Sequence, residues 1–60
     1  MECRLKELLD GRTIAWLSDK TGVHRNTITS YIRGTAPQLD KAYLIADALN
    51  KSVYDIWPPN

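Results

Sequence analysis

The sequence is poor in the groups with which small domains are often cross-linked. It has one cysteine, Cys3, and one histidine, His24, in 60 residues. A single thiol cannot form an internal disulfide bond, and one Cys with one His gives too few ligands for a structural zinc site. We therefore expect no metal or other cofactor, and a stability that rests on a small helical core. A lone thiol also fits a reducing compartment better than an oxidising one.

Long apolar runs and catalytic groupings are missing too. No stretch approaches the roughly 18 apolar residues of a membrane-spanning helix, and the N-terminus has no signal-peptide pattern. There is no acid pair, no nucleophile with a base and no glycine-rich phosphate loop. The sequence thus predicts a single domain over residues 1–60 that is cytoplasmic and is not an enzyme. Neither a membrane nor a small-molecule substrate is expected as its partner.

Negative charge is absent from the middle of the chain. The net charge is only +1, but between Lys20 and Gln38 there is no Asp or Glu at all. The same segment carries Lys20, His24, Arg25 and Arg33. This asymmetry predicts one basic, hydroxyl-rich face, which is the electrostatic pattern of a surface that binds nucleic acid.

Helical spacing of apolar residues recurs along the chain, and no pattern typical of a strand occurs. Five short helices are expected, which in chain order cover about residues 2–9, 13–20, 24–33, 39–49 and 52–56. The clearest spacing is in the fourth, where five apolar residues follow one helix face: Leu39, Ala42, Ile45, Ala46 and Leu49. The sequence therefore predicts a compact all-α fold of five helices.

Local signals set the ends of these helices. Thr13 is a suitable N-cap for the second helix, and Gly11 and Gly34 are suited to end the first and the third. Ser52 followed three residues later by Asp55 is a capping-box pattern at the start of the fifth helix.

The second and third helices are joined by a turn with glycine at its centre, Thr21-Gly22-Val23. Two short helices joined in this way form a helix-turn-helix. Gly22 permits the sharp reversal, and Val23 fills the angle between the helices. Because Leu17 and Ile28 anchor the two helices to the domain, the outward side of the third helix stays polar.

The segment Thr13–Gly34 resembles the helix-turn-helix of the Cro/Xre family of phage and bacterial transcriptional regulators. The similarity continues through Pro37, Leu44–Leu49 (LIADAL) and Ser52–Trp57 (SVYDIW). The resemblance implies a lambda-repressor-like fold of five helices, in which the third helix enters the major groove of double-stranded DNA. It also implies a small transcriptional regulator, and we expect a repressor.

The resemblance carries the base-reading positions of the family onto Arg25, Asn26 and Ser30, with Thr29 as a further candidate. The chemistry of the side chains agrees with this role. Arg can form two hydrogen bonds to guanine O6 and N7, and Asn can form two to adenine N6 and N7.

Phosphate-contacting positions of the family lie at the start of the second helix and in the turn after the third. These places hold Thr13 and the segment Arg33, Gly34 and Thr35. Backbone N–H groups at a helix N-terminus, where the helix dipole is positive, suit a phosphate oxygen. The ring of His24 is a further phosphate candidate.

Three positions depart from the pattern of the family. Ile14 stands where a phosphate-binding Gln is common, His24 where a capping Ser is common, and Trp16 where an exposed polar residue is usual. Ile14 and Trp16 beside the expected DNA face favour an alternative function: an adaptor or antirepressor that keeps the fold and binds another protein. For Trp16 a partial core role, a protein contact and an indole hydrogen bond to phosphate are all open.

The C-terminal segment and the fourth helix offer apolar residues for a contact between two copies. One module buries only roughly 600–1,000 Å² on DNA, which is little for tight specific binding. Helix-turn-helix proteins usually place two recognition helices one DNA turn apart. We therefore expect a weak homodimer on a palindromic operator, with Tyr43, Tyr54 and Trp57 in the contact. Trp57 has a second interpretation, in which it closes the core beneath the first and fourth helices.

Overall fold

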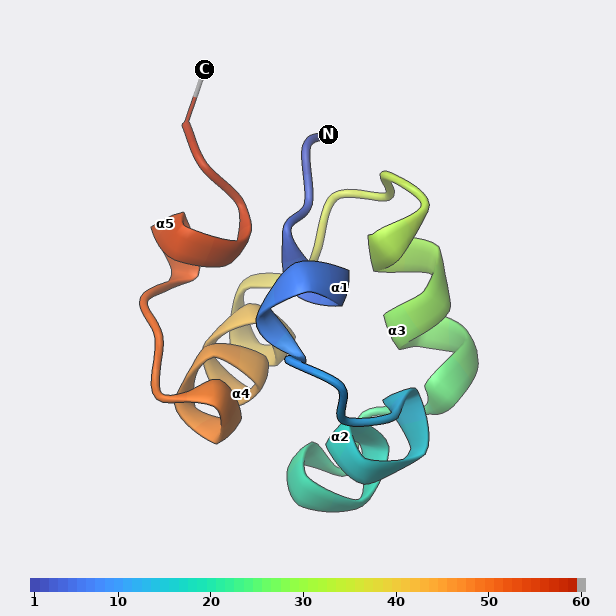
Figure 1. The fold of residues 1–60 in the computed structure, drawn as a ribbon. Coiled ribbons are helices and arrows are strands. Elements are labelled where there is room, and N and C mark those ends of the chain that lie inside the picture. The colour runs from blue at the N-terminus through green and yellow to red at the C-terminus, as the bar shows by residue number, and fades with distance from the viewer. Residues whose placement is uncertain (60) are drawn as a thin grey trace.

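The computed structural model describes residues 1–59, and this part of the chain folds into five helices without a strand. In chain order the helices are α1 (Leu5–Leu8), α2 (Ile14–Thr21), α3 (Arg25–Ile32), α4 (Leu39–Leu49) and α5 (Val53–Ile56). Figure 1 shows α3 on one side of α1, α4 and α5 on the other, and α2 at one end. The predicted all-α architecture of five helices is confirmed.

Capping interactions build the predicted helix-turn-helix from α2 and α3. The Thr13 hydroxyl accepts a hydrogen bond from the Trp16 N–H (3.0 Å) and is the N-cap of α2. α2 ends at Gly22, whose φ of +76° is left-handed and whose N–H donates to the Ser18 carbonyl (2.8 Å). No atom lies within 4 Å of the place that a Cβ would take at Gly22. The reversal therefore needs glycine for its backbone conformation and not for space.

α1 is shorter than its apolar spacing predicts, and the predicted start at residue 2 is wrong. The Arg4 N–H donates to the carbonyl of Ile56 in α5 (2.8 Å). This long-range bond ties the first residues to α5, and α1 begins at Leu5 without a side-chain cap. Of the apolar residues in this segment, Leu5 and Leu9 are buried and Leu8 is half-buried.

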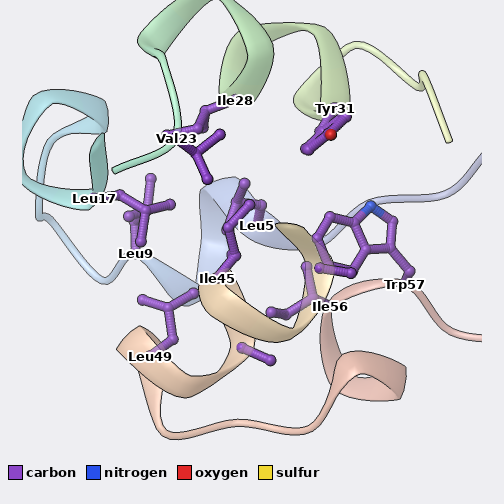
Figure 2. Close-up of a cluster of buried hydrophobic side chains, with 12 residues drawn as sticks. Leu5, Leu9, Leu17, Val23, Ile28, Tyr31, Ile45, Leu49, Ile56 and Trp57 are labelled. Atoms are coloured by element: carbon purple, nitrogen blue, oxygen red, sulfur yellow. The ribbon is translucent and has the colours of Figure 1, made fainter. Parts of the chain in front are cut away.

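A single cluster of twelve buried apolar side chains joins all five helices. Its members are Leu5, Leu9, Leu17, Val23, Ile28, Tyr31, Ala42, Ile45, Ala46, Leu49, Ile56 and Trp57. Figure 2 shows Leu5 of α1 near its centre, with Ile28 on the side of α3 and Ile45 on the side of α4. No polar or charged residue among those described is buried, so apolar burial stabilises this fold.

Trp57 belongs to this core, and its predicted role as a dimer contact is wrong. Its side chain is only 3% exposed, and its ring meets Tyr31 edge to face, with the centroids 6.1 Å apart and an interplanar angle of 82° (Figure 2). The Tyr31 hydroxyl in turn accepts from the Gln38 N–H (3.4 Å). Trp57 thus links the end of α5 to α3 and to the start of α4, and the alternative interpretation of Trp57 as a core residue is confirmed.

Leu39 is the one residue of the predicted apolar face of α4 that is not buried. It is 67% exposed, whereas the other four residues of that face belong to the core. Leu39 is the first residue of α4 and lines a surface hollow with Tyr43 and Tyr54. Helical spacing reports the direction of a side chain, but it does not report how far the neighbouring helices extend.

α5 begins with the predicted capping box. The Ser52 hydroxyl accepts from the Asp55 N–H (3.1 Å), and the Ser52 N–H donates to Asp55 Oδ2 (3.0 Å). The hydrogen bond from the Ser52 backbone, and then the one involving its side chain, lower the pKa of Asp55 below its ordinary value of 3.8. The capping box therefore depends on an ionised carboxylate.

Asp55→Asn is expected to lower stability at neutral pH and to have no effect in strong acid. Because the folded-state pKa of Asp55 is lowered, its contribution is complete above the unfolded value of 3.8 and is lost as the pH falls through the folded value. The measurement is urea unfolding of wild type and variant over a pH series. Ser52→Ala keeps the backbone N–H that donates to this carboxylate and removes the hydroxyl that accepts from the Asp55 N–H, so part of its cost should persist in strong acid. For Asp55→Asn, a stability difference that persists in strong acid would contradict this origin.

Candidate nucleic-acid interface

The outer face of α3 carries the four residues predicted to read bases. Arg25 and Asn26, in its first turn, are exposed, whereas Thr29 and Ser30 are half-buried. Ile28, on the opposite side, is fully buried and fixes the rotation of the helix. The structure therefore places these polar side chains on the surface of one helix, with the longest and most strongly polar pair farthest from the body of the domain.

His24 caps α3 in place of the serine that is common in the family. Its ring Nδ1 accepts a hydrogen bond from the Asn26 N–H (3.1 Å). This bond requires a neutral ring with Nδ1 unprotonated, so the proton is on Nε2. The exposed ring therefore keeps one N–H donor, at Nε2, for an acceptor outside the domain. Capping and a phosphate contact by His24 are compatible.

The start of α2 presents backbone donors that have no partner in the described residues. The Thr13 hydroxyl is the acceptor for Trp16 N–H, but the N–H groups of Ile14 and Ala15 make no hydrogen bond within residues 1–59. The first N–H groups of a helix have no intrahelical acceptor and lie at the positive end of its dipole. This N-terminus can therefore bind an anion without a side-chain donor at position 14.

The turn after α3 uses its backbone donors internally. Gly34, with φ +116°, donates to the Tyr31 carbonyl (3.0 Å), and the Thr35 N–H donates to the Ser30 carbonyl (3.0 Å). These two bonds form a Schellman motif, which closes a helix with a left-handed residue. Gly34 thus serves the turn and has no remaining donor. The donors that the turn can offer to a ligand are the Arg33 guanidinium and the Thr35 hydroxyl, and both residues are exposed.

A surface hollow brings the start of α2 and the second half of α3 together. Ile14 of α2, Thr29 of α3 and the C-cap residue Arg33 all line it. Lys6 and Arg12, from α1 and the loop after it, complete the cationic part of its lining. Sequence reasoning did not single out these two cations, although the position of Arg12 directly before the N-cap Thr13 places it beside the start of α2.

The cations around this surface are not neutralised within the domain. The ion pair in residues 1–59 joins Arg4 to Glu2 (3.2 Å). Lys20, Arg25 and Arg33 lie in the segment without carboxylates and pair with none elsewhere. Positive charge therefore remains available to an anionic ligand along α3 and the turns at its two ends.

Trp16 and Ile14 do not form an exposed apolar patch beside this surface. Both are half-buried, and the Arg12 guanidinium lies over the Trp16 ring, 4.4 Å from its centroid. The exposed large apolar side chains are Met1, Leu39, Tyr43, Leu44 and Tyr54. Apart from Met1 they lie on α4 and α5, on the other side of α1 from α3 (Figure 1).

The described part of the chain offers few groups for a metal site, a membrane-spanning helix or a reactive thiol. Residues 1–59 hold no group of three potential metal ligands, and none of their helices is long and apolar enough to cross a membrane. Burial raises the pKa of the Cys3 thiol, which outweighs the lowering effect of the Leu5 backbone. A thiol with a raised pKa has less of the reactive thiolate at neutral pH, so Cys3 is poorly suited to act as a nucleophile.

A comparison with known protein families shows which family contains this chain. The helix-turn-helix family matches residues 5–56, a range that spans all five helices. No curated protein and no solved structure matches the chain. The matched range contains the capped α2, the glycine turn and α3, and the arrangement is that of the lambda-repressor-like fold. The chain belongs to the helix-turn-helix family of DNA-binding transcription regulators, in its Cro/Xre branch.

Proposed function

We propose that this protein is a sequence-specific repressor that places α3 in the major groove of an operator. The observation that carries this proposal is the exposed pair Arg25 and Asn26 at the start of α3, in a chain segment (residues 20–38) without carboxylates. The open N-terminus of α2 lies beside the second half of the same helix. Arg can bind guanine and Asn can bind adenine through two hydrogen bonds each. Repression follows because a small domain bound at a promoter occupies sites that polymerase needs.

Base reading is divided between the two halves of α3. Arg25 and Asn26 are exposed and long enough to reach base edges directly. Thr29 and Ser30 are half-buried and short, so they act at close approach, through a hydroxyl hydrogen bond or the contact of the Thr29 methyl group with thymine.

Backbone contacts set the register of α3 on the duplex. One phosphate binds at the start of α2, where the Ile14 and Ala15 N–H groups are open and the Thr13 hydroxyl can still donate its proton. A second set of contacts comes from the ends of α3: the His24 Nε2–H before it, and Arg33 and Thr35 after it. Gly34 contributes the turn that aims these two side chains.

Arg33→Ala is expected to weaken binding to every DNA sequence alike. A phosphate contact carries no sequence information, and its loss should reduce the slope of log Kd against log salt by about one unit. The measurement is fluorescence anisotropy with a labelled duplex of mixed sequence over a series of KCl concentrations. Arg4→Ala removes the same charge from the α5 side of the domain and is the matched control, for which the slope should not change.

Two outcomes would contradict the proposed function or this residue's part in it. If the wild-type protein shows no salt-dependent binding to any duplex, it does not bind DNA in this way. If Arg33→Ala loses discrimination at one base pair while the salt slope stays the same, Arg33 reads a base and not a phosphate.

A weak homodimer on a palindromic operator is the second part of the proposal. The exposed side chains of Leu39, Tyr43 and Tyr54 line one hollow between α4 and α5, away from α3. An apolar surface on that side can join two copies while both α3 helices remain on the DNA. This location also disfavours the adaptor or antirepressor alternative, because the apolar residues beside α3 are half-buried.

Tyr54→Glu is expected to abolish pairing without unfolding the domain. Tyr54 is 71% exposed, so a charge there costs little in the monomer but is costly in an apolar contact. At protein concentrations below the Kd of a single half-site, sedimentation velocity should give two wild-type chains but no more than one Tyr54→Glu chain per operator duplex. One wild-type chain per duplex at saturation, on a selected site without two-fold symmetry, would exclude the dimer.

A further inference from the structure

Arg12, in the loop between α1 and α2, is held in one orientation by two contacts. Its Nε donates to the Leu9 carbonyl (2.9 Å), and its guanidinium carbon lies 4.4 Å from the centroid of the Trp16 ring. A guanidinium over an indole face is attracted by the quadrupole of the ring. An exposed arginine loses rotamer freedom when it binds a ligand, and here part of that loss has already occurred in the protein alone.

The outer part of the Arg12 guanidinium remains open. Only Nε is used by the domain, and the two Nη groups donate to no acceptor within residues 1–59. No carboxylate pairs with Arg12, since the ion pair of the described chain is Arg4 with Glu2. A planar donor with two free N–H-bearing nitrogens is suited to two oxygens of one anion, such as a carboxylate or a phosphate.

The surroundings of Arg12 concentrate positive charge. Lys6 from α1 and Arg33 from the end of α3 line the same hollow, and no Asp or Glu lines it. The hollow also includes Ile14, whose open N–H group is at the positive end of α2, and Thr29 on the outer face of α3. The hollow is therefore continuous with the surface that is proposed to meet DNA.

We propose that Arg12 binds a phosphodiester of the DNA backbone, with Lys6 beside it and with Trp16 as the residue that positions the guanidinium. The proposal rests on the proposed function and extends the interface from the helix-turn-helix to the loop that precedes it. A backbone phosphate is favoured over a small anion because the hollow joins the start of α2 to α3, so a DNA strand that follows the Ile14 N-terminus passes over it. In this proposal Trp16 is neither a core residue nor a contact to another protein; its role is to hold the Arg12 guanidinium in place.

The test measures the salt dependence of binding to a fluorescein-labelled duplex of mixed sequence. Because a phosphate contact is independent of sequence, no knowledge of the operator is needed. Arg12→Ala is expected to raise Kd several-fold and to reduce the slope of log Kd against log salt by about one unit. Arg4→Ala, with the same change in net charge, should leave the slope unchanged. Circular dichroism checks folding, and Arg12→Gln replaces Arg12→Ala if the latter unfolds.

The role of Trp16 is tested by a double-mutant cycle. Trp16→Leu keeps the charge of Arg12 and removes its stacking surface, so Kd should rise while the salt slope is retained. In the Arg12→Ala background, Trp16→Leu should have no further effect on Kd, because the group that it positions is absent. Additive effects of the two substitutions would overturn the positioning role.

The remaining outcomes separate this proposal from the proposed function. Salt-dependent binding by wild type with an unchanged slope for Arg12→Ala overturns the Arg12 contact and leaves the DNA-binding function standing. Equal slope changes for Arg12→Ala and Arg4→Ala indicate a general effect of net charge and also overturn it. If inorganic phosphate raises the melting temperature of wild type but not of Arg12→Ala, while duplex binding is equal, the hollow binds a small anion instead.

Discussion

Trp57→Ala is expected to remove most of the folding free energy of this domain. Trp57 is 3% exposed and packs edge to face on Tyr31, and truncation of a buried Trp typically costs about 3–5 kcal/mol. A domain of 60 residues has a total stability of roughly 3–9 kcal/mol. Urea unfolding followed by circular dichroism should therefore find the variant largely unfolded or with a strongly lowered midpoint.

Trp57→Phe separates loss of the aromatic contact from loss of volume. The indole Nε1–H of Trp57 is buried without a hydrogen-bond partner of standard geometry; the Cys3 sulfur beside it is a weak acceptor. Phe removes this unsatisfied donor and keeps a ring against Tyr31. Its cost should thus be well below that of Ala.

Tyr54→Ala is the matched control for the substitution of Trp57. Tyr54 lies three residues away and is 71% exposed, so its truncation should change stability by no more than about 0.5 kcal/mol. If Trp57→Ala instead leaves stability intact and changes only the association of two chains, Trp57 is a dimer contact and its place in the core is wrong.

The burial of Trp57 is a feature of the fold that the sequence alone could not predict. Apolar spacing and caps are local, and they predicted α4, the Thr13 cap and the capping box of α5 correctly. Whether Trp57 is buried depends on Tyr31, 26 positions earlier in the chain, and on the hydrogen bond from the Arg4 N–H to the Ile56 carbonyl. Such long-range contacts leave no local pattern, so the sequence left both a dimer contact and a core position open for Trp57.

The same distinction applies to the candidate site. The face of α3 is readable from the sequence, because apolar Ile28, Tyr31 and Ile32 follow helical spacing on one side, whereas polar Asn26, Thr29 and Ser30 follow it on another. The importance of Arg12 is not readable, since it depends on α1 ending beside α2 and on the rotamer that stacks on Trp16. The commitment of the Gly34 amide to its own helix also follows from the turn geometry and not from the residue type.

Asn26→Ala is expected to weaken binding to the operator by about 1–3 kcal/mol, which is roughly 5–150-fold in Kd. The amide side chain can form two hydrogen bonds to adenine, and truncation leaves the base edge without partners in a desolvated groove. Stability should not change, because the hydrogen bond to the His24 cap uses the backbone N–H of Asn26 and not its side chain. The variant thus tests recognition separately from folding.

The measurement compares two duplexes, one with a site selected from a random DNA pool and one with the same bases scrambled. Asn26 has no charge, so its loss should leave the salt slope and the affinity for scrambled DNA nearly unchanged. Arg33→Ala provides the opposite pattern, with both duplexes weakened alike and a lower slope. If Asn26→Ala lowers the affinity for both duplexes equally, Asn26 does not read a base, and the discrimination rests on Arg25, Thr29 and Ser30.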